Sequence, residues 1–322
     1  MTDEGFAQWV SERADIVEAR LRTAVETSYA LVSEAAQYLI DAGGKRFRPT
    51  LTIAAGGFGL DAALDEEGLL SAAVVVELTH VASLYHDDVM DEAELRRDIP
   101  TAHRRWGNSV AILVGDYMLA QASLVGAALG EDFMTYQART LSRLVQGQIA
   151  EISGPAAGAD PLEHYLSVVA DKTAALIAAS ARYGAIFAGL PADQVESLTE
   201  YGEQLGLAFQ VADDLLDILG EQSGKQPGTD LREGVATLVP LLVQSQARPR
   251  DARLLELLAA PVPDADIPEA LTLLRAHPAV GEARAQIRHW ANQAATNLAG
   301  FPDTAPTRAL KRLCDQAVLR TR

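Results

Sequence analysis

Long apolar runs with few glycines or prolines run through most of the chain. The clearest begins after Gly68 and contains neither Gly nor Pro until Pro100. Its first part, LLSAAVVVELTHVASLY, is apolar nearly all the way round, and the valines at 74–76 could suggest a strand. The uninterrupted length exceeds that of an ordinary strand and therefore predicts a helix. A helix that is apolar on all sides belongs at the centre of a protein.

Similar patterns predict further helices, with breaks between them that are all short. The runs lie at about 10–42, 109–129, 132–152, 162–189, 193–219 and 229–246. Alanine is abundant, aromatic residues make up 6% of the chain, and no Asn-Gly or Asp-Gly hairpin signal occurs. The breaks at 154–161, 223–228 and 261–268 have the length of helix connections. We therefore expect an all-α fold, with residues 1–322 in one large helical bundle.

Composition narrows the kinds of partner. The chain carries 27 basic and 44 acidic residues, a formal charge of −17, which argues against nucleic acid because phosphate binding needs an excess of cations. The single Cys314 forms no internal disulfide, which fits a reducing compartment. Charges interrupt the apolar stretches and no secretory signal is visible, so we expect a cytoplasmic protein without a spanning helix.

The five-residue pattern Asp-Asp-x-x-Asp occurs twice. The two copies are Asp87, Asp88 and Asp91, and Asp213, Asp214 and Asp217. On a helix the first and last carboxylates of each triplet share a face, and both triplets lie within apolar helical runs. Carboxylate oxygens suit Mg²⁺, which completes its coordination with water and phosphate oxygens. The pattern predicts several Mg²⁺ ions and a phosphorylated ligand.

Two rival metal sites fit less well. A di-iron bundle needs a Glu-x-x-His pair on each of two helices, and only Glu77 with His80 matches. An EF-hand needs alternating loop ligands and a central Gly, which neither triplet has.

Basic residues gather close in sequence to the acidic motifs. Lys45, Arg46 and Arg48 follow Gly43-Gly44, and Arg96-Arg97 follow the first triplet. Each group could simply be a set of cations at a helix end. Arg and Lys beside carboxylates that hold Mg²⁺ also describe a site that ionises or transfers a diphosphate.

In this arrangement the chain resembles the trans-isoprenyl diphosphate (polyprenyl) synthases over nearly its whole length. The matching segments, in the family's order, are GGKRFRP at 43–49, HDDVMDEAELRRDIPTAH at 86–103, GDYMLAQAS at 115–123, GQIAE at 147–151, KTA at 172–174, FQVADDLLD at 209–217 and GKQPGTDLREG at 224–234. The resemblance implies an isoprenoid synthase-like bundle around a central cavity, a homodimer, and condensation of isopentenyl diphosphate with an allylic diphosphate.

The resemblance also implies roles for single residues. Mg²⁺ would be ligated by Asp87, Asp91 and Asp213, with support from Asp88, Asp214 and Asp217. The allylic diphosphate would be held by Arg96, Lys172 and Lys225, and isopentenyl diphosphate by Lys45, Arg48, His80 and Arg97. The allylic cation would be stabilised by Phe209, Gln210 and Thr173. One departure is Val235, where the family often has Lys.

Product length depends on the residues just before Asp87. In the family a bulky aromatic residue there stops elongation, whereas Ala82 and Ser83 are small. We therefore expect a medium or long product of about thirty to fifty carbon atoms, made on geranyl, farnesyl or geranylgeranyl diphosphate. A short-chain (farnesyl or geranylgeranyl) synthase, a terpene cyclase and a non-catalytic partner subunit are the alternatives. Release of an apolar product suggests transient membrane contact.

Overall fold

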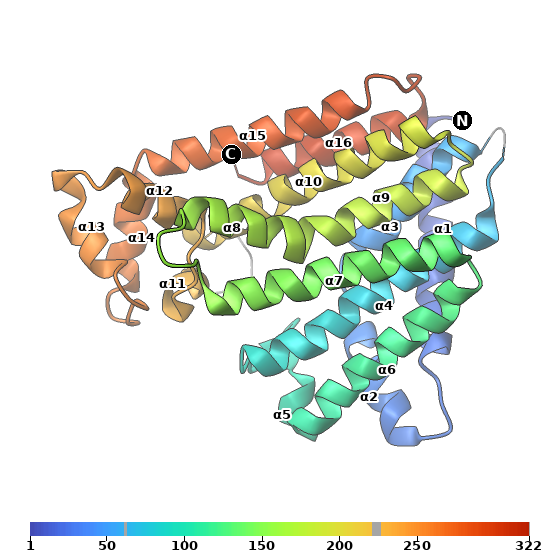
Figure 1. Ribbon diagram of the computed structural model, residues 1–322, viewed down its shortest axis with the longest axis horizontal. Coiled ribbons are helices and arrows are strands. Elements are labelled where there is room, and N and C mark those ends of the chain that lie inside the picture. The colour runs from blue at the N-terminus through green and yellow to red at the C-terminus, as the bar shows by residue number, and fades with distance from the viewer. Residues whose placement is uncertain (61–62, 221–226, 322) are drawn as a thin grey trace. The chain divides into compact units, whose positions relative to one another are not determined.

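The computed structural model describes residues 1–60, 63–220 and 227–321 and is built almost entirely of helices (Figure 1). In these ranges the only strands are two of two residues each. This confirms the prediction of an all-α fold. The chain divides into a first unit, Met1–Ser142, Leu176–Thr199 and Phe301–Leu310, and a second unit, Arg143–Ala175, Glu200–Gly300 and Lys311–Arg322. That they form one domain stays a prediction.

The first unit is built around one long helix. Its elements are α1 (Asp3–Ala24), α2 (Ala30–Asp41), α3 (Phe47–Gly56), η1 (Gly57–Gly59), α4 (Glu66–Met90), β1 (Leu95–Arg96), β2 (Ile99–Pro100), α5 (Ala102–Trp106) and α6 (Asn108–Ala127). Helices α1, α3 and α6 pack on α4 (Figure 1). The side chain of Asp65 caps α4 by accepting from the backbone N–H of Gly68, and Glu66 and Glu67 complement the dipole of its first turn. The prediction of a central helix is confirmed.

Helix α4 ends earlier than its sequence suggests. The run without Gly or Pro continues to Pro100, but the helix ends at Met90 and the chain turns into the β1–β2 hairpin. Positive φ angles at Glu92, Arg97 and Asp98 make these turns without glycine. The expectation of helix up to Pro100 was therefore wrong.

The second unit contains shorter helices, and four helices contribute residues to both units. The second unit has α8 (Pro161–Val169), the π-helical turn η2 (Ala170–Ala174), α11 (Thr229–Glu233), α12 (Leu238–Gln246), η3 (Pro249–Asp251), α13 (Ala252–Leu257), α14 (Ile267–Ala276) and α15 (Ala279–Asn297). The shared helices are α7 (Glu131–Ser153), α9 (Ala175–Phe187), α10 (Ala192–Leu219) and α16 (Ala305–Leu319).

Three predicted runs differ from the structure in their interior. The run at 10–42 is two helices, α1 and α2, and the run at 229–246 is interrupted at Gly234, whose φ is +73°. The run at 162–189 is continuous, but η2 widens it at residues 170–174. A π-turn leaves no trace in hydrophobic periodicity, and such turns are frequent at functional sites.

Among the described residues, two helices are long and apolar enough, by length and composition alone, to cross a membrane, and the expectation that no helix spans one stays a prediction. They are α4, with 78% of its most apolar window buried, and α6, with 33% buried. The burial of α4 is that of a core helix. Helix α6 leaves much of its apolar surface exposed.

Candidate active site

The first aspartate triplet lies at the C-terminal end of α4. Asp87 and Asp88 are in the last turn, and Asp91 is the residue after the helix, with its N–H bonded to the carbonyl of Asp87 at 2.8 Å. Asp91 is exposed, Asp87 is half-buried and Asp88 is fully buried. The outer two carboxylates are therefore the accessible members of the triplet.

Asp88 is neutralised by Arg96 of the β1–β2 hairpin. Both Nε (2.8 Å) and Nη2 (2.6 Å) of Arg96 contact Asp88 Oδ1, and Asp88 Oδ2 is buried with no partner among the described residues. Burial raises the pKa of Asp88, and Arg96 opposes that rise. The pair links the end of α4 to the hairpin.

Arg48, His80 and Arg97 form a basic cluster in the first unit. Burial lowers the pKa of His80 well below its ordinary value, and the charges of Arg48 and Arg97 lower it further. The pKa of Arg48 is also lowered by burial, and its Nε is buried with no partner among the described residues. A neutral imidazole beside two guanidinium groups, one of which has an unsatisfied Nε, suits an anion.

Arg97, from the β1–β2 hairpin, packs against the backbone at Gly43 and Gly44. Arg97 Nη1 donates to the carbonyls of Leu39 (2.6 Å) and Gly43. A Cβ on Gly44, whose φ is +138°, would lie 2.8 Å from Arg97 Nη2. The positive φ favours glycine at position 44, and a side chain there would also displace the tip of Arg97.

Lys45 and Arg46 differ although they are neighbours. Lys45 is exposed. Arg46 turns toward Glu18 (2.6 Å) and the buried Glu77 (3.1 Å), so its charge is used within the protein. Lys45 remains available for a ligand.

The second triplet lies near the end of α10, in the second unit. Asp213 Oδ1 lies 2.5 Å from Nη2 of Arg320, at the end of the chain. The same guanidinium lies over the ring of Phe209, 5.0 Å from its centroid. The carbonyl of Thr321 accepts from Arg284 Nε at 2.6 Å, which anchors this end of the chain.

Asp214 heads a chain of hydrogen bonds. It accepts from the hydroxyl of Tyr165 and from Gln210 Nε2 (2.8 Å), and Gln210 Oε1 accepts from Thr173 Oγ1 at 3.0 Å. Burial raises the pKa of Asp214 to about 6, although both hydrogen bonds lower it. These hydrogen bonds fix the orientation of the Gln210 side-chain amide, with its nitrogen toward Asp214 and its oxygen toward Thr173.

Asp217 caps the next helix in the second unit. Its two oxygens accept from the backbone N–H groups of Thr229 (3.1 Å) and Asp230 (3.2 Å) at the start of α11. A carboxylate oxygen can accept more than one bond, so these contacts leave capacity for an ion or water. Val235 is 39% exposed, and Lys225 lies outside the described residues.

Lys172 and Thr173 lie in the π-turn η2. Lys172 Nζ forms an ion pair with Glu151 of α7. Glu151 belongs to the GQIAE segment, so two of the matching segments meet here.

The residues expected to set product length lie on α4. Ala82 is fully buried, and Ser83 bonds to the carbonyl of His80 at 2.8 Å. One turn earlier, the buried Thr79 accepts from Gln137 Nε2 (2.9 Å), and Gln137 Oε1 accepts from the hydroxyl of Tyr183 (2.9 Å). The face of α4 one turn before Ala82 is therefore contacted through Thr79 by the larger side chain of Gln137, which in turn contacts Tyr183. The sequence did not reveal these two side chains.

The donor set fits a hard divalent cation. Among the described residues no group of three or more His, Cys, Asp or Glu side chains converges on one point. Mg²⁺ often takes only one or two carboxylates and fills its octahedron with water and substrate phosphates. The accessible carboxylates of each triplet match that need.

Sequence reasoning missed Tyr165 and Arg320. They are 49 and 107 residues from the aspartates that they contact. Neither lies in a matching segment, so no local signal pointed to them.

The chain has close relatives among known proteins. The family model described as polyprenyl synthetase matches residues 29–274. The nonaprenyl diphosphate synthase of Mycobacterium tuberculosis is 44% identical over 321 residues, 99% of this chain and 95% of that protein.

Solved structures agree in fold. A decaprenyl diphosphate synthase from Rhodobacter capsulatus has a TM-score of 0.88 and 32% identity, over 100% of both chains. A geranylgeranyl pyrophosphate synthase from Corynebacterium glutamicum, complexed with calcium and isoprenyl diphosphate, has a TM-score of 0.87 and 38% identity, over 97% of this chain and 96% of that one.

Proposed function

This chain belongs to the polyprenyl synthetase family of prenyl transferases, and on that premise we propose that it elongates an allylic diphosphate with isopentenyl diphosphate, using Mg²⁺. The allylic substrate is geranyl, farnesyl or geranylgeranyl diphosphate.

The observation that carries this proposal is the pair of sites on one face of α4. His80, within the basic cluster, and Asp87 are seven residues apart, so they share a face about 10 Å apart. One site offers cations and a neutral imidazole, and the other offers carboxylates. Two diphosphates, one bound directly and one through metal ions, match this arrangement.

Isopentenyl diphosphate is assigned to the basic cluster. Arg48 and Arg97 bring guanidinium donors, His80 is neutral, and the exposed Lys45 adds a mobile charge. Arginine suits the fixed contacts because its donors match phosphate geometry, whereas lysine acts as a point charge.

The allylic diphosphate is assigned to the aspartates and to further cations. Asp87, Asp91 and Asp213 would ligate Mg²⁺, which supplies Lewis-acid stabilisation of the leaving diphosphate when bound. Asp88, Asp214 and Asp217 support these ligands indirectly. They bind Arg96, the side chain of Gln210 and the backbone at the start of α11, respectively. The structure bound to calcium and isoprenyl diphosphate from Corynebacterium glutamicum supports a divalent ion.

The remaining residues stabilise the charges that develop during the reaction, on the leaving diphosphate and on the allylic cation. Arg96, Lys172 and Lys225 hold the diphosphate as the bond between C1 and oxygen breaks and the oxygen keeps the electron pair. The isopentenyl double bond then attacks C1, and the released diphosphate takes the proton that is lost. Phe209, through its ring face, and the oxygens of Gln210 and Thr173 stabilise the cation between these steps.

Product length is proposed to be medium or long, about thirty to fifty carbon atoms. The small Ala82 and Ser83 support this, as do relatives named nonaprenyl and decaprenyl diphosphate synthase. A short-chain synthase is the second candidate, because Gln137 and Tyr183 meet the wall at Thr79.

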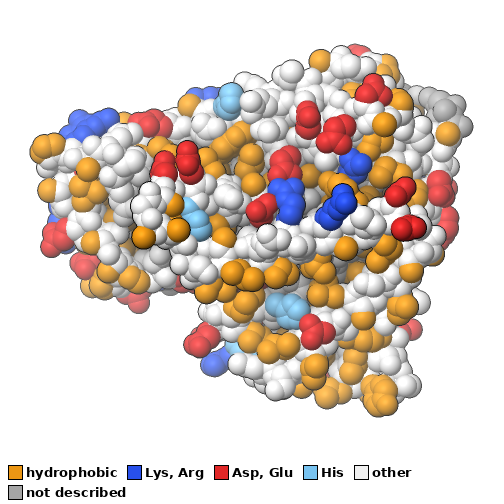
Figure 2. Space-filling view, in the orientation of Figure 1, with side chains coloured by type: hydrophobic (Ala, Val, Ile, Leu, Met, Phe, Trp, Pro, Cys, Tyr) orange, Lys and Arg blue, Asp and Glu red, His pale blue; other side chains and the backbone are white. Residues whose placement is uncertain are grey.

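The proposed assembly is a cytoplasmic homodimer that touches a membrane only when product leaves. Three side chains on α6 are exposed by 42%, 65% and 67%, namely Ile112, Leu113 and Leu124. Figure 2 shows hydrophobic side chains gathered over this helix. A second copy that covers this face would remove apolar surface from water.

The test is to incubate purified protein with Mg²⁺, labelled isopentenyl diphosphate and farnesyl diphosphate, and to size the products by mass spectrometry. Products of thirty or more carbons support the proposal, and Ala82→Phe should then shorten them. Products of twenty carbons would favour the short-chain candidate. No incorporation would contradict the proposal and leave a cyclase or a partner subunit.

A further inference from the structure

Within the second unit, the π-turn η2 is contacted by two helices, α7 and α10. It carries Lys172 and Thr173, the two residues of α8–α9 that the proposed function uses. Three residues of α7 and two of α10 contact it, and a third residue of α10 is linked to it through α7; each set is spaced so that it forms one stripe along its helix.

The stripe on α7 consists of Arg143, Gly147 and Glu151. Arg143 Nε donates to Asp171 Oδ1 at 2.8 Å, and Glu151 pairs with Lys172 Nζ. Between them, a Cβ on Gly147 would lie 2.7 Å from the backbone nitrogen of Lys172. Helix α7 therefore touches the turn at both ends and is in backbone contact at its middle.

The stripe on α10 consists of Glu203, Gly206 and Gln210. A Cβ on Gly206 would lie 2.6 Å from the Cα of Ala174, and Gln210 accepts from Thr173 Oγ1 at 3.0 Å. Glu203 does not touch the turn itself. It accepts from Arg143 Nη2 at 2.6 Å and from Nη1 at 3.3 Å.

Arg143 is the one side chain that joins both stripes to the turn among the described contacts. Its guanidinium contacts Asp171 in the turn and Glu203 on α10, and Nη2 lies 3.4 Å from the carbonyl of Ala170. Burial lowers the pKa of Arg143, but the hydrogen bonds that it donates to Glu203 and Asp171 outweigh this effect, so its pKa is raised. Without Arg143, two carboxylates would face each other without a shared counterion.

From this geometry we propose that Arg143 is a positioning residue, which fixes the π-turn so that Lys172 Nζ and Thr173 Oγ1 meet the allylic substrate. This inference rests on the proposed function. Arg143 itself does not touch substrate. A shift of the turn by about 1 Å can reduce the rate about 100-fold when the displaced groups act in the transition state.

The test is Arg143→Met, which keeps the length of the side chain and removes the charge. The kcat/KM for farnesyl diphosphate should fall about 10- to 100-fold, whereas the KM for isopentenyl diphosphate should stay unchanged. Gly147→Ala should likewise lower the kcat/KM for farnesyl diphosphate and leave the KM for isopentenyl diphosphate unchanged. It does so without a change of charge, because its methyl group pushes on the turn.

A neutral triple variant separates positioning from stability. In Arg143→Met with Asp171→Asn and Glu203→Gln, the unpaired carboxylates are gone, so the melting temperature should recover while the kinetic defect stays. Recovery of both together would overturn the proposal, because a structural role alone would then explain the data.

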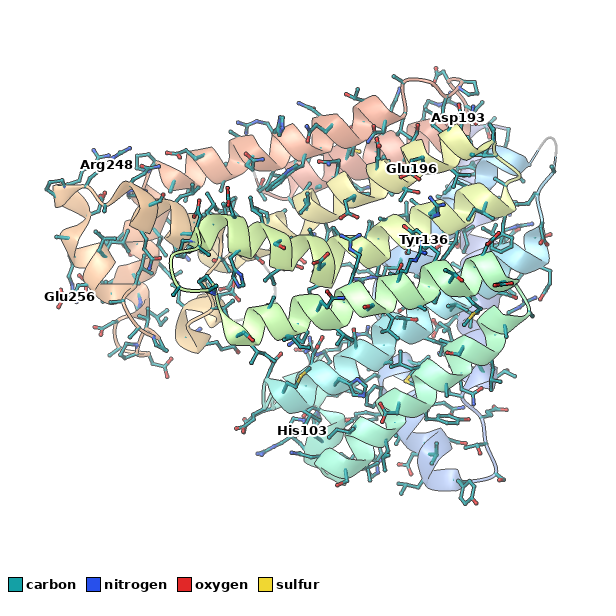
Figure 3. The ribbon with its side chains drawn as sticks, viewed as in Figure 1. His103, Tyr136, Asp193, Glu196, Arg248 and Glu256 are labelled. Carbon is teal, nitrogen blue, oxygen red and sulfur yellow. The ribbon has the colours of Figure 1, made fainter. Side chains whose placement is uncertain are left out.

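The matched control is Arg182→Met on α9. Arg182 also pairs with a glutamate, Glu196, at 2.9 Å and lies over the ring of Tyr136, 4.5 Å from its centroid, but it is in the first unit. Figure 3 labels Tyr136 and Glu196. It should leave the kcat/KM for farnesyl diphosphate unchanged. The same split in this variant, or none in Arg143→Met, would overturn the proposal.

Binding gives a readout that does not depend on turnover. The Kd of farnesyl thiolodiphosphate, measured by calorimetry, should rise in Arg143→Met and stay unchanged in Arg182→Met. An unchanged Kd in Arg143→Met would overturn the positioning role. Failure of the proposed function would instead show as absence of isopentenyl incorporation by the wild-type protein.

Discussion

The two aspartate triplets have the same spacing but different surroundings. The first ends a buried helix, and its last member, Asp91, is exposed beyond the helix end. The second lies inside α10, and its last member, Asp217, caps the start of α11. The shared pattern therefore specifies which side chains are available, and the neighbouring elements decide what else each one does.

The middle members show the difference most clearly. Asp88 is paired with a cation, Arg96, whereas among the described residues Asp214 accepts from the neutral Tyr165 and Gln210. Burial raises the pKa of both, and that of Asp214 reaches about 6. A neutral partner stabilises a buried carboxylate less than a guanidinium does.

The largest effect is expected from the first members of the triplets. Asp87→Asn and Asp213→Asn should each lower kcat about 100- to 1000-fold, because a ligand of the ion that stabilises the leaving group is lost. The measurement is the steady-state rate of isopentenyl incorporation at saturating Mg²⁺. Asp98→Asn, in the exposed hairpin turn, is the control. Wild-type rates in either triplet variant would contradict the assignment.

The middle members should differ in stability. Asp88→Asn breaks a largely buried ion pair and should lower the free energy of unfolding by about 2 kcal/mol. Asp214→Asn loses hydrogen bonds but also removes a buried carboxylate whose ionisation costs stability at pH 7, so it should lower the free energy of unfolding by no more than about 1 kcal/mol.

The pH dependence of Asp214 sharpens this contrast. Its pKa in the folded protein is about 6, above its ordinary value of 3.8, so the folded state binds the proton more tightly. Its ionisation therefore lowers stability as pH rises from about 4 through 6. Urea unfolding at pH 7 measures both variants. An equal loss in the two would contradict the difference in their partners.

Asp213, the first member of the second triplet, carries an arginine, Arg320, on its Oδ1. Because a metal ion held by Asp213 would lie close to the positive charge of Arg320, Arg320→Gln should tighten Mn²⁺ binding about fivefold, as removal of one nearby charge predicts. Lys311→Gln, which changes an exposed cation on α16, the helix before Arg320, is the control. Electron paramagnetic resonance of free Mn²⁺ gives the affinity, and equal affinities in both variants would count against competition.

The smallest effect concerns His80, in the basic cluster near the first triplet. Its pKa in the folded protein lies well below its ordinary 6.5, so below that pH the unfolded state binds a proton that the folded state does not. Stability should therefore fall as pH drops from 7 to 5, by up to about 1 kcal/mol per unit. His80→Gln should flatten this slope, measured by urea unfolding at several pH values. An unchanged slope would show that other groups cause it.

The sequence predicted features that are encoded locally. The all-round apolar run predicted α4 as the central helix, and the repeated triplet predicted two acidic sites on helices. The end of α4 at Met90 was missed because the turns that follow use Glu92, Arg97 and Asp98 rather than glycine.

Contacts between distant segments could not be predicted. Arg143 and Glu203 are 60 residues apart, and the π-turn between them has the same apolar pattern as an α-helix. Tyr165, on α8, and Arg320, just after α16, contact the second triplet and belong to no matching segment. The roles of the site residues, Lys225 included, stay predictions.

The central claim is that both triplets bind divalent ions together with a diphosphate, in spite of their different surroundings. The most direct test is to count bound Mn²⁺ with and without farnesyl thiolodiphosphate in the wild-type protein, Asp87→Asn and Asp213→Asn. The account predicts that the ligand increases the bound Mn²⁺ in the wild type and that each variant loses part of that increase. A full wild-type count in either variant would contradict it.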